Sequence, residues 1–155
     1  TQVLRARDEA ERQELWRVRR ELSPALKTIK PVKFNHDVVV PKGRIPELFA
    51  LVAELRRRHD VLIPCFGHAG DGNIHVNIMI DDRDEDRRRA GLAERELFEG
   101  VVALGGSISD EHGIGLTKAR FLSLELAPDV IDLMRRVKEA FDPNGILNPG
   151  KIFDA

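Results

Sequence analysis

The spacing of apolar residues along this chain predicts both helices and strands. Apolar residues that recur every three or four positions are typical of helices, and strict alternation is typical of strands with one buried face. Helices are expected over residues 3–22, over 44–59, from the charged run 81–89 to about 104, and over 116–126 and 128–141. Strands are expected at 33–40, 61–67 and 73–80, with a short one at 107–109.

Glycine and proline mark the ends of these elements. Pro41 and Gly43 end the first strand. Gly105-Gly106 ends the helix that is expected to run to about residue 104. Ser23-Pro24 has the form of an N-cap followed by proline at the first helical position, so a second short helix or turn is expected through Ile29.

The order of elements between residues 32 and 110 is strand, helix, strand, strand, helix, strand. This order is the ferredoxin-like βαββαβ pattern, an antiparallel sheet with both helices on one face. We therefore expect an α+β fold in a single domain over residues 1–155. N-terminal helices would occupy 1–30, and a helical C-terminal part and tail would occupy 111–155.

Composition narrows the class of protein. The 155 residues are 42% hydrophobic and 33% charged, which is typical of a folded globular domain. The net charge is −1 and basic residues alternate with acidic ones, so no nucleic-acid partner is expected. The apolar runs are too short for a transmembrane helix. Cys65, the single cysteine, is expected to be a small buried residue rather than a nucleophile.

A glycine-rich turn between two expected strands carries the first candidate chemistry. His75 and Asn77 are two residues apart, so on a strand they face the same side. His68 ends the preceding strand, and a hairpin could bring its imidazole and that of His75 to one ion, with Asp71 as a cap or a further ligand. Two histidines at loose spacing also occur in ordinary hairpins, so both interpretations stay open at this point.

Glu111-His112 raises the weight of the metal interpretation. Glu111 would complete a His, His, Glu set with open positions for a substrate, and such a set suits Zn²⁺, Mn²⁺, Co²⁺ or Fe²⁺. His112 is the natural general base, because an imidazole exchanges its proton near neutral pH; the alternative is a histidine at a helix start that bonds a carbonyl group. Gly113-Ile114-Gly115 lacks the third glycine of a dinucleotide fingerprint, so no nicotinamide site is expected.

Arg19 and Ser23 lie four residues apart on the expected N-terminal helix, so both side chains could face the same way. Without further information, a surface arginine and a helix cap are the simpler interpretation of this pair.

Four segments carry a resemblance to a known family: Asp37–Pro41, Gly67–His75, Gly106–Gly115 and Phe141–Lys151. They follow one another in the family's order across nearly the whole chain. On these motifs the chain resembles the C-terminal part of FAD-linked oxidases of the vanillyl-alcohol-oxidase type. The matching members are D-2-hydroxy acid dehydrogenases, namely the glycolate oxidase flavoprotein subunit, D-lactate dehydrogenase and D-2-hydroxyglutarate dehydrogenase.

The resemblance implies a role for each matching residue. His68, His75 and Glu111 match the metal ligands of the metal-dependent members, and His112 matches the base that takes the substrate hydroxyl proton. The positions that contact substrate, two of them through its carboxylate, are matched by Arg19, Ser23 and Asn77. Lys33 stands near a substrate-binding lysine, although the alignment puts Asn35 at that place. Asn148 and Lys151 belong to the tail that returns toward the flavin in the family.

The expected function follows from the same resemblance. The chain would be the substrate- and metal-binding part of an enzyme that oxidises a small 2-hydroxy acid to a 2-oxo acid, with Zn or Mn here and FAD held by a domain absent from this chain. Further partners would be an electron acceptor, other oxidase subunits or a second copy in a homodimer. We expect a cytoplasmic location, with any contact to the inner membrane made through partners. The alternatives are a catalytically inert cap or assembly module and, with less support, a metal-dependent hydrolase.

Overall fold

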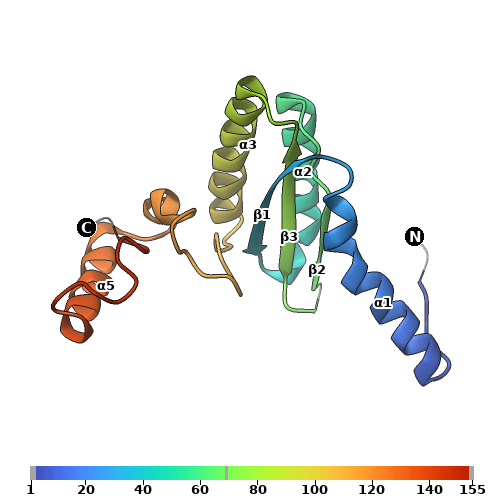
Figure 1. Cartoon of the computed structure of the whole chain (residues 1–155), viewed down its shortest axis with the longest axis horizontal. Helices are drawn as coiled ribbons and strands as arrows, with labels where there is room; N and C mark the ends of the chain where they lie inside the picture. Colours follow the sequence, from blue (N-terminus) through green and yellow to red (C-terminus); the bar gives the residue numbers. More distant parts are fainter. Residues whose placement is uncertain (1–2, 69, 154–155) are drawn as a thin grey trace.

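The computed structural model describes residues 3–68 and 70–153; residues 1–2, 69 and 154–155, which include Ala69 of the expected turn, lie outside the described part. A three-stranded antiparallel sheet in the order β1-β3-β2 forms its centre. The strands are β1 (Val32–Val39), β2 (Cys65–His68) and β3 (Asn73–Ile80). Helices α2 (Ile45–His59) and α3 (Asp84–Ala103) pack together over one face of the sheet (Figure 1). The expected α+β class is confirmed.

Alternation along the two long strands separates an apolar face of the sheet from a polar one. The core under α2 and α3 comprises Val38, Val40, Leu48, Leu55, Ile74, Val76, Ile78, Leu97, Phe98 and Val101. The intervening residues Asn73, His75 and Asn77 occupy the opposite face of β3. Burying one large aliphatic side chain contributes roughly 1.5–3 kcal/mol. The apolar face therefore determines on which side of the sheet the polar residues lie.

Helix α1 (Glu9–Leu26) differs from the expectation at both ends. It begins at Glu9 rather than near residue 3, because Oδ1 of Asp8 accepts a hydrogen bond from the backbone N–H of Glu11 (2.9 Å) and caps the helix. It then continues past Ser23 with Pro24 in its last turn. Ser23 does not start a second helix, because α1 continues through it to Leu26 and only a turn follows over residues 27–29. The hydroxyl of Ser23 accepts a hydrogen bond from Nζ of Lys33.

Two of the expected strands are shorter than the sequence pattern indicates. The strand expected over 61–67 is regular only as β2 (Cys65–His68), which starts after Pro64, because Pro64 lacks the N–H that a continuous ladder requires. The expected strand at 107–109 is reduced to one antiparallel bridge between Ser107 and Val39. The next residue, Ile108, donates its backbone N–H to the carboxylate of Glu125 (2.9 Å) instead of continuing the ladder.

The C-terminal part is more fragmented than expected. The helix predicted over 116–126 is instead a 3₁₀ turn, η2 (Ala119–Phe121), followed by α4 (Leu122–Glu125). A second 3₁₀ turn, η1 (Lys42–Arg44), precedes α2. Helix α5 (Pro128–Phe141) has the expected bounds, but none of its residues is buried. The tail after α5 returns to the body, where the backbone N–H of Ile152 donates to the carbonyl oxygen of Gly115 (2.8 Å).

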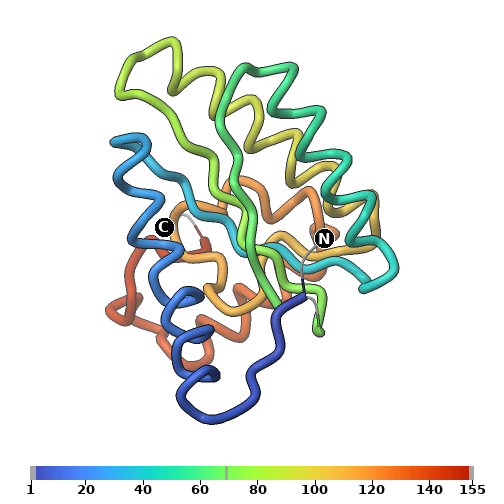
Figure 2. Tube along the Cα trace, turned by 90° about the vertical axis from the view of Figure 1, so that its right-hand side faces the viewer, coloured from blue at the N-terminus to red at the C-terminus, as the bar shows by residue number. Residues whose placement is uncertain are grey.

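The molecule is elongated, with α1 and α5 projecting on either side of the helix-covered sheet (Figure 1). Seen along the long axis, α1 lies in front of the sheet and the C-terminal segment lies behind it (Figure 2). Among the described helices, none combines the length and the apolar character that crossing a membrane requires.

Candidate metal and substrate site

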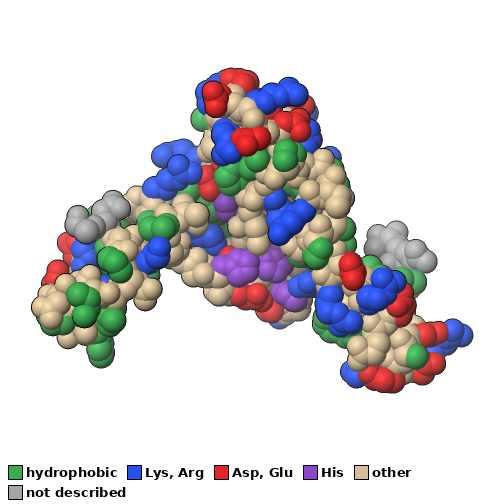
Figure 3. All heavy atoms as spheres, viewed as in Figure 1, with side chains coloured by type: hydrophobic (Ala, Val, Ile, Leu, Met, Phe, Trp, Pro, Cys, Tyr) green, Lys and Arg blue, Asp and Glu red, His purple; other side chains and the backbone are tan. Residues whose placement is uncertain are grey.

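Histidine side chains gather on one face of the molecule, between the two projecting segments (Figure 3). They come from the polar face of the sheet. His75 stands on β3 opposite Phe66 of β2, and His68 ends β2 opposite Asn73. The rings of His68 and His75 are nearly perpendicular, with their centroids 5.8 Å apart. The expectation that a hairpin brings these two imidazoles together matches the observed geometry.

Two glycines permit the tight approach of strands at this hairpin. Gly72 has a φ of +91°, and a Cβ there would lie 2.1 Å from the carbonyl oxygen of Val40. A Cβ at Gly67 would lie 2.3 Å from the carbonyl oxygen of Asn73. Neither position accepts a side chain without movement of the backbone.

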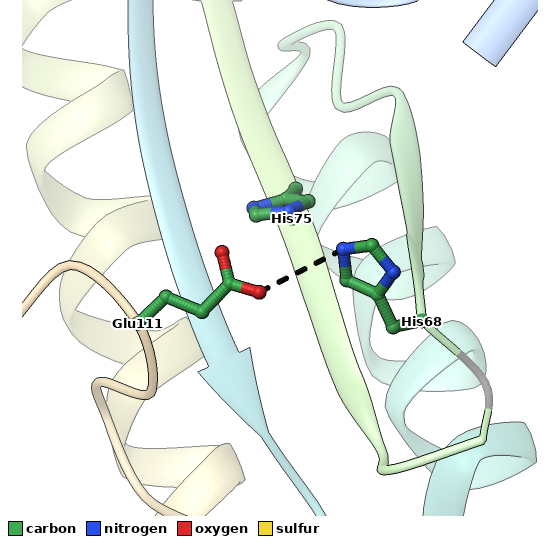
Figure 4. A group of neighbouring side chains, drawn as sticks. All are labelled: His68, His75 and Glu111. Carbon is green, nitrogen blue, oxygen red and sulfur yellow. Dashed lines mark ion pairs between the residues drawn. The ribbon is translucent and has the colours of Figure 1, made fainter. Parts of the chain in front are cut away.

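Glu111 reaches the two histidines from the loop that follows α3. Its Oε1 lies 3.7 Å from Nε2 of His68, and one ligand atom from each of His68, His75 and Glu111 lies within 4.8 Å of the others (Figure 4). This arrangement is a candidate cation site composed of two imidazoles and one carboxylate, a donor set that suits Zn²⁺ or Mn²⁺.

The state of His75 fits a metal ligand. Its Nδ1 is buried and has no hydrogen-bond partner among the described residues, and an unpaired buried polar atom costs about 1–3 kcal/mol. Burial lowers the pKa of His75, and His112 and His68 act in the same direction while Glu111 opposes them. The neutral imidazole that a metal ion binds is therefore the favoured form.

His112 lies directly beside this candidate cation site. Its ring stacks on that of His75 with the centroids 5.6 Å apart. Nδ1 of His112 lies 3.3 Å from Oδ1 of Asp37. The alternative of a histidine at a helix start bonded to a carbonyl group is not what the structure has, because no helix begins there and the facing group is a carboxylate.

The N-terminal helix borders the same site. Nη2 of Arg19 donates toward Nε2 of His68 at 3.3 Å, and its guanidinium lies 5.6 Å from the ring centroid of Phe66. Nζ of Lys33 donates to Oγ of Ser23 at 2.8 Å. Burial lowers the pKa of Lys33, with a contribution from Lys27. The structure thus brings Arg19 to the histidine pair and joins Ser23 to Lys33, so neither is merely a surface arginine or a cap.

Asn77 is fully buried beside His75. Its amide nitrogen donates to the carbonyl oxygens of Pro64 (3.2 Å) and His75 (3.3 Å), and its Oδ1 has no partner among the described residues. Asn35, the position that the family alignment puts in place of Lys33, is exposed and stands opposite Asn77 in the ladder.

Asn148 and Lys151 lie elsewhere, in the tail beside α5. They line a largely apolar groove together with Leu133 and Val137. Within the described part of the tail, the backbone N–H of Ile152 donates to the carbonyl oxygen of Gly115, in the loop that follows Glu111 and His112. The described residues of this chain therefore do not place Asn148 or Lys151 among the histidines.

Sequence reasoning missed two residues that shape the site, Asp37 and Lys118. Asp37 is fully buried and accepts a hydrogen bond from Nζ of Lys118 at 2.8 Å. The available signal was a charged residue inside the apolar strand segment, at an even spacing from Lys33 and Asn35. Its partner is 81 positions away in the chain, so no local pattern could identify it.

Comparisons with known proteins agree on one family. The family model described as "FAD linked oxidases, C-terminal domain" matches residues 1–152. Glycolate oxidase subunit GlcD of Bacillus subtilis (strain 168) is 40% identical over 152 residues, which are 97% of this chain and 32% of that protein. D-2-hydroxyglutarate dehydrogenase of Stutzerimonas stutzeri (strain A1501) is 39% identical over 155 residues, with 97% and 33% covered. D-lactate dehydrogenase of Anaerostipes hadrus is 38% identical over 152 residues, with 97% and 32% covered. The chain thus spans about a third of the length of these relatives.

Proposed function

We propose, on the premise that the chain belongs to the family of C-terminal domains of FAD-linked oxidases, that it is the substrate- and metal-binding part of a D-2-hydroxy acid dehydrogenase or oxidase. Three relatives are named as proteins that act on glycolate, D-2-hydroxyglutarate and D-lactate. The reaction proposed for the whole enzyme is oxidation of a small 2-hydroxy acid to the 2-oxo acid.

The observation that carries this proposal is the convergence of His68, His75 and Glu111 within 4.8 Å beside a third imidazole, that of His112. The three ligand residues would hold a divalent ion, Zn²⁺ or Mn²⁺, with coordination positions left for the substrate. Such an ion lowers the pKa of a bound hydroxyl group. We assign the acceptance of the hydroxyl proton to His112, because its ring stacks on the ring of His75, one of the proposed ligands.

Arg19 supplies a positive charge for the substrate carboxylate. It lies between the ring of Phe66 and Nε2 of His68, so it would turn from the imidazole toward the carboxylate when an ion occupies the site. A guanidinium can bind a carboxylate through two parallel hydrogen bonds. Ser23 and Lys33 extend this donor surface, while Asn77 supports His75 from the buried side.

The hydride that leaves C2 requires an acceptor, and FAD supplies that chemistry when it is bound. The flavin would be held by a separate portion of the enzyme, with Asn148 and Lys151 of the tail facing it. The exposed apolar residues of α5, Val130, Leu133 and Val137, fit contact with that portion. In isolation the chain would then act as a folded cap without turnover. The same proposal gives the whole enzyme an electron acceptor, any further oxidase subunits and a homodimeric state.

The decisive test is turnover by the polypeptide that joins this chain to its flavin-binding portion. Glycolate, D-lactate and D-2-hydroxyglutarate would each be assayed with and without a chelator. We expect one of them to be oxidised with loss of activity on chelation, and we expect His112→Ala to lower kcat by about 10²–10⁴-fold. His59→Ala is the matched control, since His59 is the last residue of α2 and is hydrogen-bonded to Glu96 of α3. Full turnover after removal of all metal would contradict the metal assignment, and unchanged kcat in His112→Ala would contradict the base.

A further inference from the structure

The buried carboxylate of Asp37 connects the sheet to the loop that carries Glu111 and His112. Asp37 stands opposite His75 in the ladder between β1 and β3, and 0% of its surface is exposed. Its Oδ2 accepts hydrogen bonds from the backbone N–H groups of Asp110 (3.1 Å) and His112 (3.0 Å). One carboxylate oxygen therefore holds both amides that flank Glu111.

The other oxygen of Asp37 faces two side chains. Oδ1 accepts a hydrogen bond from Nζ of Lys118 (2.8 Å) and lies 3.3 Å from Nδ1 of His112. Lys118 is also buried and donates to the carbonyl oxygen of Asp37 at 3.1 Å. Burial raises the pKa of Asp37, but the hydrogen bonds from Lys118 and the two backbone amides outweigh this effect and lower the pKa to about 2. The carboxylate is thus charged and fully paired.

The loop has few other means of holding its position. Residues 109–118 form no regular helix or strand, and the bridge between Ser107 and Val39 ends just before them. Fixing the backbone of one residue costs roughly 1–2 kcal/mol, and a hydrogen bond to a charged group returns roughly 1.5–3 kcal/mol. Nδ2 of Asn73 also donates a hydrogen bond to the carboxylate of Asp110 (2.7 Å). Together with the hydrogen bonds to Asp37, it supplies a free energy of the size needed to order the segment 110–112.

We infer that Asp37, with Lys118 as its counter-charge, is the positioning residue of the site. It holds the segment 110–112 so that Glu111 meets His68 and His75, and it orients the ring of His112. The consequences for turnover and for ion binding rest on the proposed function. The consequence for the order of the loop does not.

The experiment replaces the pair by apolar residues of similar size, Asp37→Leu with Lys118→Met. Replacing both partners of a buried ion pair is often neutral for stability, whereas removing one partner costs about 3–5 kcal/mol. The matched control is Glu94→Leu with Arg120→Met, because these two residues form another ion pair in which the acid, Glu94, is buried. Three quantities are measured: hydrogen exchange at the amides of Asp110 and His112, affinity for Zn²⁺ or Mn²⁺ by calorimetry, and kcat of the flavin-containing enzyme at saturating metal.

We expect the Asp37 and Lys118 double variant to exchange both amides at least about 10-fold faster and to bind the ion about 10- to 100-fold more weakly. We also expect kcat at saturating metal to fall about 10-fold or more, while the control stays within about twofold in all three measurements. Wild-type exchange and affinity in the folded double variant would overturn the inference. If that variant does not fold, Asp37→Asn replaces it, with about 10-fold weaker ion binding expected and wild-type affinity again overturning the inference.

The outcomes separate this inference from the proposed function. Absence of turnover in the wild-type enzyme, together with weakened ion binding in the double variant, would contradict the proposed reaction and support the positioning role. Turnover that is lost in His112→Ala but unchanged in the double variant would contradict the positioning role alone.

Discussion

Nε2 of His68 lies 3.7 Å from Oε1 of Glu111, although strand β3 and the 20-residue helix α3 separate them in the chain. The two residues meet because the hairpin between β2 and β3 and the loop after α3 lie at the same end of the sheet, where β1 and β2 finish. With His75 they form the candidate cation site.

Removal of one ligand should weaken ion binding. We expect His68→Ala or Glu111→Ala to lower affinity for Zn²⁺ or Mn²⁺ by about 100-fold or more, because a two-ligand site remains. Isothermal calorimetry on the purified chain measures the effect. His59→Ala is the control, and equal affinities in all three variants and the wild type would show that the ion binds elsewhere.

Arg19 should act on substrate binding. We expect Arg19→Met to raise KM for the 2-hydroxy acid by about 10- to 100-fold with a smaller change in kcat, because a charge-assisted hydrogen bond contributes about 1.5–3 kcal/mol. Steady-state kinetics of the flavin-containing enzyme provide the measurement. Arg20→Met is the control, since the neighbouring side chain is exposed. A wild-type KM in Arg19→Met would remove Arg19 from the substrate site.

His36 should make stability depend on pH. Burial lowers its pKa from 6.5 to about 4, with Lys118 and Arg120 acting in the same direction and Asp37 opposing them. The unfolded chain therefore binds a proton between pH 6.5 and 4 that the folded chain does not, and stability falls as pH falls through this window. At 1.36 kcal/mol per pKa unit the loss is about 3 kcal/mol.

Oε1 of Glu94 lies 3.5 Å from Nε2 of His36. Burial raises the pKa of Glu94 against the effect of Arg120. Glu94 therefore changes the stability with pH in the direction opposite to His36. The contribution of His36 is therefore isolated by comparison with His36→Gln. Urea unfolding at several pH values should give a flatter profile for His36→Gln than for the wild type. Parallel profiles for the two proteins would show that His36 titrates normally in the folded state.

The hairpin should depend on Gly72 and not on Gly70. A Cβ at Gly72 would lie 2.1 Å from the carbonyl oxygen of Val40 at a φ of +91°, whereas a Cβ at Gly70 would meet nothing within 4 Å. We expect Gly72→Ala to lower the free energy of unfolding by about 2 kcal/mol or more and Gly70→Ala to change it by about 0.5 kcal/mol or less. Thermal or urea unfolding measures both, and equal effects of the two substitutions would show that the turn rearranges freely.

Local patterns predict the elements whose ends are marked by local chemistry. β3 alternates strictly and follows a glycine turn, and α5 starts at Pro128 and ends before an Asp-Pro-Asn-Gly turn, so both have the expected bounds. The segment 107–109 and the helix expected at 116–126 are decided by partners distant in the chain, such as Glu125 for Ile108, and their local pattern is misleading.

The residues of the candidate site also divide into those that the sequence predicts and those that it does not. Alternation places His75 and Asn77 on one face, and the resemblance to the family brings Glu111 to them. Asp37 could not be assigned from the sequence, because its hydrogen bonds to Asp110, His112 and Lys118 connect residues 73 to 81 positions apart. Its importance arises only once the fold has placed the loop above the sheet.

The alternation along β3 has a consequence for how this domain can change over evolution. Ile74, Val76 and Ile78 face the helices, and Asn73, His75 and Asn77 face the site. A shift of the pairing by one residue would turn Asn73, His75 and Asn77 into the core and the isoleucines of β3 out of it. Insertions or deletions within this strand are therefore tolerated only in pairs, so the chemistry and the core of the domain must be inherited as one unit.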